Sequence, residues 1–415
     1  MSGSIGFSRS AARKWAASQG VLLMGGGEGG ARLAPLWGTM ERVAALGDFP
    51  VEAVPVAVPS GKRLASPRHA ARLKASAACT LTRLVDITGD GGVVSGVTID
   101  ASLAAREAAG FASYTHGGSS LNRNDVLWED VTVTDYGETA AQAALLNTCA
   151  IVIDSDASAS AVTSGGVIRG CRAIDRTLKA PYGFRLRSQF IGYQRGEIPG
   201  LSKCVIEDSE IIGTTKNAVE LAGPNVFDCV VRRVRVRNMI GQGGIETDYG
   251  AHGILFEECD VGHFGADGVI TRSTAAFSWR SSDQGDSKTK EGSGNRAVDC
   301  RVHHFTSAGA YTFKAFHLIS VRDSVIERLR VHDIRRGADA AISANVGIYI
   351  ETNHGEVHNI AILDPDIRDV DIPVQISGSN ACSDIFVRGG RWKGSIAVMP
   401  SRPRRRWPMS ASAGA

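Results

Sequence analysis

Three acidic residues stand where paired carboxylates could cleave a glycosidic bond. Glu220 and Glu246 lie in two similar apolar segments, and Asp248 follows two residues after Glu246. If these segments are adjacent parallel strands, Glu220 and Glu246 lie ~5 Å apart, and Glu246 and Asp248 ~7 Å apart along one strand. Carboxyl groups are roughly 5 Å apart in retaining glycosidases and roughly 6.5–9.5 Å apart in inverting ones. Both pairs are candidates for acid–base catalysis, and side-chain rotation leaves the stereochemistry open.

The same acids would also suit a metal-assisted elimination on a uronic-acid polymer. Glu246 and Asp248 could hold Ca²⁺, because hard cations take carboxylate oxygens, and the ion would neutralise the substrate carboxylate. A cationic side chain with a lowered pKa could then remove the C5 proton, and a second group could protonate the leaving oxygen. The candidate bases are Lys314 and Arg272, and the candidate proton donors are His252 and Tyr349.

Further side chains border these acids and are candidates for substrate binding. Segments 188–200 and 273–295 read as loops, and their aromatic side chains could stack on sugar faces or pin the loops to the body of the protein. The candidate binding residues are Arg185, Arg187, Tyr349, Glu351, His252, Trp279 and Tyr193.

A repeated pattern must position these residues. It consists of an apolar pair, two mostly polar residues, a small or apolar residue, a polar one and an apolar one. Its copies start at residues 93, 127, 167, 205, 230, 255, 296, 325, 361 and 386. The shortest period, 25 residues, is too short for paired-helix repeats, and the copies are rich in Val and Ile with alternating polarity. The repeat therefore predicts stacked strands.

Charges in successive copies predict that each copy lies beside the next. Like charges on neighbouring strands are unfavourable, so a sign that alternates at a fixed period indicates direct pairing. The alternating columns are Glu207, Arg232, Glu257, then Asp208, Arg233, Glu258, and then Glu210, Arg235, Asp260. The last column continues through Arg301, Arg330, Asp366 and Arg391, with one like-signed step between Arg301 and Arg330.

A second strand is expected after each copy, often preceded by Gly at a tight corner. The expected strands are 184–187, 219–222, 245–248, 269–272, 311–314, 348–351 and 374–377. Their outward columns would place Glu246 beside Ile270 and Asp248 beside Arg272, with Lys314 one coil further. Because these columns do not alternate in sign, we predict the functional site here.

These patterns predict an all-β chain, a right-handed parallel β-helix of about ten coils. Residues 1–54 read as a capping or anchoring segment with short helices at 8–19 and 37–46, residues 55–400 as the β-helix and residues 401–415 as a basic tail. We expect this basic tail to be a solvated terminus and not a nucleic-acid-binding segment. The sequence shows neither a signal peptide nor a membrane span.

The eight cysteines are expected to be free thiols in the core. Cys171, Cys259 and Cys300 occupy the fifth repeat position, and Cys204 and Cys229 precede the first, as small core residues would. A disulfide between Cys204 and Cys229 is compatible with the ~4.8 Å spacing of adjacent coils. Free thiols would fit assembly inside a cell.

The chain resembles the pectate-lyase-like superfamily of right-handed parallel β-helices, which includes polysaccharide lyases, hydrolases, epimerases and phage tailspike depolymerases. The resemblance rests on the repeat and on the stretches Val58-Pro-Ser-Gly-Lys62, Ile87-Thr-Gly-Asp90 and Gly96-Val-Thr-Ile-Asp100. The paired-aspartate motif of polygalacturonases is missing, and Gly250-Ala-His-Gly253 is only similar to their Gly-His-Gly. No single family is matched by its motifs.

This resemblance implies a protein that recognises a polysaccharide and cleaves it, as a lyase or a hydrolase. The alternative is a receptor-binding spike or adhesin that recognises a surface polysaccharide without cutting it. Either would suit a virion or particle surface, or an extracellular location if a signal peptide was removed. The resemblance also implies a homotrimer, which cyclic symmetry permits, anchored through the N-terminal segment.

Overall fold

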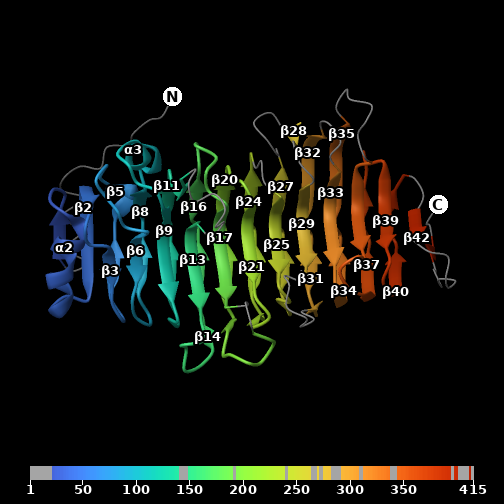
Figure 1. Cartoon of the computed structure of the whole chain (residues 1–415), viewed down its shortest axis with the longest axis horizontal. Helices are drawn as coiled ribbons and strands as arrows, with labels where there is room; N and C mark the ends of the chain where they lie inside the picture. The colour runs from blue at the N-terminus through green and yellow to red at the C-terminus, as the bar shows by residue number, and fades with distance from the viewer. Residues whose placement is uncertain are drawn as a thin grey trace.

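The computed structural model describes residues 21–139, 148–189, 193–238, 242–262, 269–270, 274–281, 291–307, 312–336, 344–393, 397–400 and 411–412. Over these residues the chain winds along one axis from the N-terminal to the C-terminal end, and each coil adds parallel strands to the one before (Figure 1). The predicted right-handed parallel β-helix is confirmed.

The ten copies of the repeat pair in the predicted register. Their first three residues form the first wall, where Val205 pairs with Val230 and Val230 with Leu255. The strands of this wall are β1 (Val21–Met24), β2 (Arg42–Val51), β4 (Arg63–Ala65), β7 (Val93–Ser95), β10 (Leu127–Glu129), β15 (Val167–Arg169), β19 (Val205–Glu207), β23 (Val230–Arg232), β26 (Leu255–Glu257), β30 (Gly292–Ser293), β31 (Arg296–Val298), β34 (Val321–Glu327), β37 (Val357–Leu363), β40 (Cys382–Arg388) and β43 (Ala411–Ser412).

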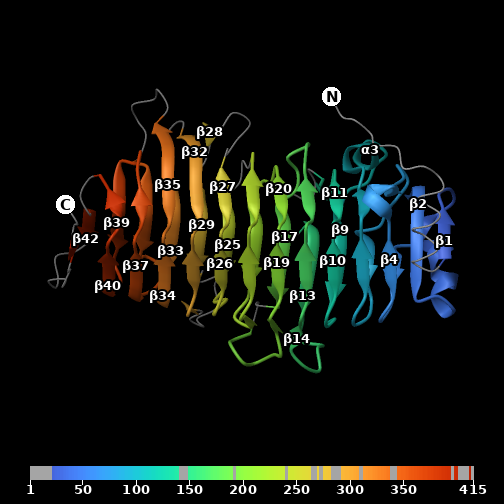
Figure 2. The same cartoon turned by 180° about the vertical axis from the view of Figure 1, so that it is seen from behind.

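The last residues of each copy form the second wall after a sharp corner. The fourth repeat residue makes this corner with a left-handed backbone, at φ 52° in both Asp208 and Arg233. The strands of the second wall are β5 (Ala71–Ala75), β8 (Val97–Asp100), β11 (Thr132–Thr134), β16 (Arg172–Ile174), β20 (Glu210–Ile212), β24 (Arg235–Arg237), β27 (Asp260–Gly262), β28 (Val269–Ile270), β32 (Arg301–Ser307), β35 (Arg330–Arg336), β38 (Asp366–Ile367) and β41 (Arg391–Trp392). Seen from behind, β20, β27, β32 and β35 lie above β19, β26 and β34 (Figure 2).

The third wall is a separate parallel sheet made of the longer second strands. Its strands are β3 (Val56–Val58), β6 (Arg83–Ile87), β9 (Tyr114–Leu121), β13 (Cys149–Ser155), β17 (Tyr182–Ser188), β21 (Asn217–Ala222), β25 (Gly243–Asp248), β29 (Thr274–Arg280), β33 (Phe313–Ile319), β36 (Val346–Glu351), β39 (Ile372–Gly378) and β42 (Ala397–Pro400), with β12 (Gly137–Glu138) antiparallel to β9. A small sheet at one corner comprises β14 (Thr163–Ser164), β18 (Leu201–Ser202) and β22 (Val226–Phe227).

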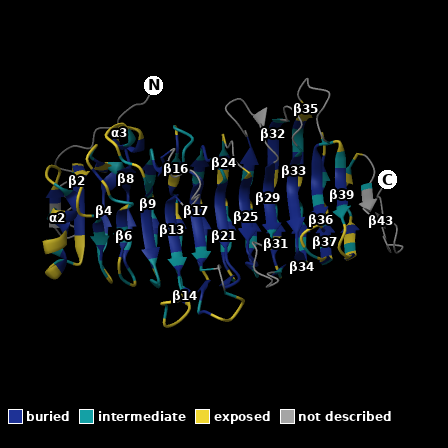
Figure 3. Ribbon diagram, viewed as in Figure 1, coloured by how far each residue is buried: buried dark blue, intermediate teal, exposed yellow. Residues whose placement is uncertain are grey.

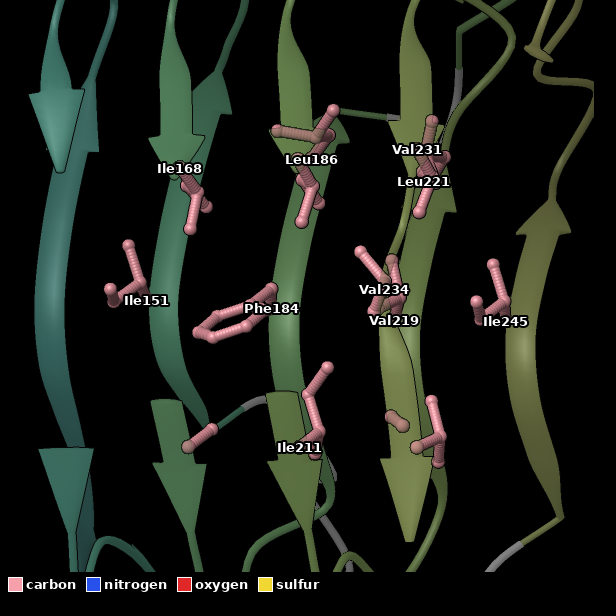
Figure 4. Packing of buried hydrophobic residues seen from close by; sticks show 14 of the residues in the cluster. Ile151, Ile168, Phe184, Leu186, Ile211, Val219, Leu221, Val231, Val234 and Ile245 are labelled. Carbon is pink, nitrogen blue, oxygen red and sulfur yellow. The ribbon is translucent and has the colours of Figure 1, made fainter. Parts of the chain in front are cut away.

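The core is a set of apolar columns that run along the axis. Ile151, Phe184, Val219 and Ile245 occupy successive coils of the third wall and point inward (Figure 4). The strands are buried along most of their length, whereas exposed residues gather at the corners (Figure 3). All eight cysteines are buried and free, as predicted. Among the described residues, no helix has the length and apolar character to cross a bilayer.

The N-terminal part differs from the prediction. The helix expected over 37–46 is wrong, because β2 begins at Arg42 and pairs with β4 and β5. Parallel pairing starts already at β1, ahead of residue 55. Main-chain hydrogen bonds to the first coil override the helical propensity of this Ala-containing segment. The remaining short helices are α2 (Gly29–Leu33), η1 (Ala34–Gly38), η2 (Pro67–His69) and α3 (Leu103–Ala108). The segments 8–19 and 401–410 lie outside the described residues.

Candidate functional site

The outer face of the third wall carries three columns of largely polar side chains. They face outward because the residues between them, such as Phe184 and Leu186, are buried in the core. In chain order the columns are Tyr182, Asn217, Gly243, Ala275, Lys314 and Val346, then Arg185, Glu220, Glu246, Ser278, His317 and Tyr349, and then Arg187, Ala222, Asp248, Arg280, Ile319 and Glu351.

Two coils of this wall differ from the predicted alignment. Ile245 pairs with Phe277 and Phe277 with Phe316, so the strand after β25 is β29 and not residues 269–272. Val269 pairs with Thr306 in the second wall instead. The predicted columns containing Ile270 and Thr312 are therefore wrong, because the insertion after β27 is longer than the pattern implied.

Glu220, Glu246 and Asp248 form one compact group, which we call the carboxylate cluster. Glu220 and Glu246 pair directly on adjacent strands, and Asp248 lies on the same side of β25. One carboxylate oxygen from each residue lies within 4.8 Å of one from both others. Glu246 and Asp248 are each 3% exposed and Glu220 is 0% exposed. Only the first two therefore present any atoms to an approaching ligand.

Asn217 joins two members of the carboxylate cluster. Its side-chain Nδ2 donates to Glu220 Oε1 at 3.2 Å and to Glu246 Oε1 at 3.0 Å. The next residue in its column is Gly243, where a Cβ would lie 2.7 Å from Asn217 Oδ1 and 3.3 Å from Glu246 Oε2. A glycine is required here because any side chain would displace the amide that holds the two carboxylates together.

Arg185 pairs with Glu220 in the interior of the wall. The two side chains are 3% and 0% exposed, and the guanidinium carbon lies 4.3 Å from the centre of the Tyr182 ring. Burial lowers the pKa of the Arg185 guanidinium, but the carboxylate of Glu220 together with Tyr182, Cys149 and Asp154 outweighs burial, so the pKa is raised. This buried ion pair holds one negative charge of the cluster in place.

The other two carboxylates are poorly solvated and titrate above their usual range. Burial raises the pKa of Glu246 to about 8, opposed by the charge of Arg280 and reinforced by those of Asp248 and Glu220. Burial likewise raises the pKa of Asp248, again opposed by Arg280. Like charges this close are unfavourable, so one proton stays in the cluster at neutral pH, and we assign it to Glu246.

This proton makes stability depend on pH. In the unfolded chain Glu246 returns to its ordinary pKa of 4.5, whereas the folded value is about 8. Between these values only the folded state keeps the proton. The stabilisation of the folded state by this proton is therefore complete below pH ~4.5 and is lost as the pH rises to ~8. We expect the urea midpoint of the wild type to fall from pH 5 to pH 8 more steeply than that of Glu246→Gln. Equal slopes would contradict the assignment.

A second polar group lies two coils further along the wall. His317 Nε2 lies 2.8 Å from Glu351 Oε2, and Lys314 Nζ lies 4.0 Å from the same oxygen and 4.5 Å from the centre of the Tyr349 ring. The hydrogen bond from His317 lowers the pKa of Glu351 to about 2. Burial lowers the pKa of His317 to about 4, so the imidazole is neutral and its Nε2 donates. We call Lys314, His317, Tyr349 and Glu351 the downstream group.

Several predicted site residues lie apart from the carboxylate cluster. His252 stacks on Phe227 with ring centres 5.6 Å apart, at the corner after β25. Arg187 lies on the same outer face, where its Nε donates to Asp154 at 3.0 Å. Tyr193 is half-buried in the irregular segment before β18. Arg272 lies outside the described residues.

Trp279 is a core residue and not a substrate-binding loop residue, so that prediction is wrong. It lies in β29 with its ring centre 4.8 Å from that of Phe316 and 6.4 Å from that of Phe256. The alternation Phe277-Ser-Trp279 matches that of Phe184-Arg-Leu186 and could have revealed this strand. We expect Trp279→Ala to lower the free energy of unfolding by about 3–5 kcal/mol, measured by urea denaturation. A loss below ~1 kcal/mol would argue for a surface position.

Sequence reasoning missed four residues of this wall: Asn217, Ser278, Arg280 and His317. Arg280 takes the place predicted for Arg272, one coil after Asp248, because Trp279 pairs with Thr247. The charge of Arg280 acts on both Glu246 and Asp248. The strand alternation in β29 was the signal that could have located Ser278 and Arg280.

The oxygen donors of the carboxylate cluster meet the distance requirement of a hard cation. Three carboxylate oxygens within 4.8 Å of one another suit Ca²⁺, which takes oxygen ligands. Glu220 is paired with Arg185 and is 0% exposed, so Glu246 and Asp248 would be the ligands. Binding would require Glu246 to release its proton, and an ion so held would supply positive charge to a substrate carboxylate.

The stacked parallel strands define a class of protein: the right-handed parallel β-helix. Among solved structures, the surface adhesin PfbA of Streptococcus pneumoniae matches with a TM-score of 0.51 and 14% identity, over 85% of this chain and 87% of that one.

Two polysaccharide-acting enzymes match less well. The endo-xylogalacturonan hydrolase from Aspergillus tubingensis matches with a TM-score of 0.46 and 11% identity, over 95% of this chain and 100% of that one. The A-module of the Azotobacter vinelandii mannuronan C-5 epimerase AlgE4 matches with a TM-score of 0.45 and 10% identity, over 94% and 100%. No family model and no curated protein matches the sequence. At these identities the likeness concerns the fold alone.

Proposed function

We propose that this protein cleaves a polysaccharide by hydrolysis at the carboxylate cluster. The observation that carries the proposal is the raised pKa of Glu246, about 8, beside two further carboxylates. A carboxyl group that keeps its proton at neutral pH next to an ionised one is the arrangement that glycoside hydrolysis requires.

In this proposal Glu246 is the general acid and Asp248 the nucleophile. Glu246 donates its proton to the glycosidic oxygen as that bond breaks and Asp248 bonds to the sugar carbon; a water that gives its proton back to Glu246 then releases the sugar from Asp248. Both side chains face outward from the same strand, each is 3% exposed, and one oxygen of each lies within 4.8 Å of one of the other, nearer the separation of retaining enzymes than that of inverting ones. Glu220 does not contact the substrate: with Arg185 and Asn217 it positions Glu246.

The substrate in this proposal is a polymer that lies along the third wall. The downstream group begins two coils, about 10 Å, beyond Glu246 and offers a cation, an aromatic ring and a carboxylate. Such groups suit sugar hydroxyls, ring faces and acidic substituents. On the other side, Arg185 and Arg187 lie one coil before Glu220 and Ala222.

A calcium-assisted lyase reaction is the second candidate, and the clustered oxygens favour it. Glu246 and Asp248 would hold the ion. Lys314, whose pKa is lowered by burial, would serve as the base, and Tyr349 as the proton donor. Lys314 lies two coils from Gly243, so a substrate would have to span about 10 Å between metal and base. This spacing makes hydrolysis the better-supported reaction.

Location and assembly remain predictions from the sequence. A homotrimeric spike on a virion or particle, anchored through residues 1–54, would present the third wall to a surface polysaccharide. The same spike without activity would be a receptor-binding protein. Light scattering of the purified chain measures the stoichiometry, and a monomer would contradict the trimer.

The test is incubation with a panel of bacterial capsular and uronic-acid polymers, with and without a calcium chelator. Hydrolysis predicts new reducing ends without absorbance near 235 nm, and no effect of chelation. Absorbance near 235 nm that chelation removes would identify the lyase. A polymer that binds but stays intact would favour the receptor-binding alternative and contradict cleavage.

A further inference from the structure

One step of the second wall breaks the alternation of charge found elsewhere in its column. The column comprises Glu210, Arg235, Asp260, Arg301, Arg330, Asp366 and Arg391, each beside the next in register. Arg301 and Arg330 are directly paired neighbours on β32 and β35, and both are exposed. Like charges in direct register repel each other, so this step is unfavourable unless an anion offsets it.

The acids that flank this step do not neutralise it. Asp260, one coil before Arg301, accepts from Arg237 Nη2 at 2.9 Å and lies 2.6 Å from His303 Nε2. Asp366, one coil after Arg330, accepts two hydrogen bonds from Arg368, both at 2.7 Å. Within the described part of the chain, Arg301 and Arg330 form no ion pair.

Two imidazoles extend the same patch. His303 and His332 follow Arg301 and Arg330 two positions along their strands and therefore lie on the same face. They pair in register, and their rings stack with centres 5.4 Å apart and planes 8° apart. The patch thus combines two guanidiniums with two imidazoles on adjacent strands. These strands, β32 and β35, lie side by side in Figure 2.

One surface hollow is lined by Arg301 and a second by Arg330. Arg301 lines the end of a hollow of about 660 Å³ that also includes Arg235 and Asp260. Arg330 lines the next hollow, of about 420 Å³, together with Asp366 and Arg391. Because both hollows follow the same corner of the β-helix, an extended chain along the axis would pass over the arginine pair.

We propose that Arg301 and Arg330, with His332 beside them, bind a sulfate or phosphate group of an acidic polymer. Two adjacent guanidiniums offer more donors than the two oxygens of a carboxylate can accept, whereas a tetrahedral oxyanion presents three or more. The hollows on both sides favour a group carried by a polymer over a free ion. This site lies on a different wall from the carboxylate cluster and does not depend on catalysis there.

The test is calorimetry on the full chain with a sulfated oligosaccharide, its desulfated counterpart, inorganic sulfate and inorganic phosphate, at constant ionic strength. We expect the sulfated oligosaccharide to bind and the desulfated one not to bind. Arg301→Gln and Arg330→Gln should each weaken binding at least tenfold. Arg72→Gln is the matched control, because this exposed arginine of the same wall pairs with Asp100 on β8, lines neither hollow and should leave binding as in the wild type.

Misfolding is separated from loss of binding by thermal unfolding at low salt. Both test variants relieve the repulsion between the arginines, so their Tm without ligand should equal or exceed that of the wild type. Absence of binding by the wild type, or equal weakening in all three variants, would overturn the site. Binding of the inorganic ions but not of the sulfated oligosaccharide would overturn the polymer as its ligand.

Discussion

Glu246→Gln is expected to reduce kcat for polymer cleavage by about 10²–10⁴-fold, the usual contribution of a positioned general acid. Glutamine keeps an acceptor for the amide of Asn217 and has nearly the same shape, but it has no proton to give. The wild-type rate should also fall as pH rises through about 8, where Glu246 loses its proton. The measurement is the initial rate of reducing-end formation from pH 5 to pH 9.

The matched control for this prediction is Glu210→Gln. Glu210 lies on the second wall and pairs with Arg172 at 3.0 Å, so Glu210→Gln makes the same side-chain substitution away from the carboxylate cluster. Its rate should equal that of the wild type. Cleavage by Glu246→Gln at the rate of Glu210→Gln would remove Glu246 from the mechanism.

Arg185→Met is expected to lower the free energy of unfolding by about 3–5 kcal/mol, since it leaves the buried carboxylate of Glu220 without its partner. The double variant with Glu220→Met should recover most of this loss, because replacing both members of a buried pair by apolar side chains is often neutral. Urea denaturation measures both effects. The loss arises from an uncompensated charge and not from a missing attraction.

The comparison variant is Arg172→Met, which breaks the half-exposed pair with Glu210. The Arg172 side chain is 49% exposed, so water replaces its partner and the urea midpoint should stay unchanged. Equal losses of unfolding free energy in Arg172→Met and Arg185→Met would show that the Arg185–Glu220 pair stabilises the fold no more than the half-exposed Arg172–Glu210 pair does.

The first wall could be predicted from the sequence because its period and its charge signs are local properties. Val205, Val230 and Leu255 recur at a constant step, and their register is the predicted one. The third wall was harder to predict. Its strands follow loops of variable length, so the position of β29 depends on which residues enter the core. Phe277 and Trp279, and not the segment at Val269, pair with β25.

The candidate site was predictable where it lies on one continuous run of coils. Glu220, Glu246 and Asp248 come together as the sequence implied, because no long insertion separates β21 from β25. Arg280 and His317 were missed because both follow the insertions. The sequence pattern could not predict how far the carboxylates are buried. Alternation placed them on the outer face, but only the structure shows that water hardly reaches them and that Glu246 therefore keeps its proton.

The most direct test of the central claim is a crystal structure of Glu246→Gln with an oligosaccharide of the cleaved polymer. Our account predicts a sugar chain along the third wall, with a glycosidic oxygen within about 3.2 Å of the side-chain nitrogen of residue 246. An oligosaccharide bound along the first or second wall, with no glycosidic bond near residue 246, would contradict it.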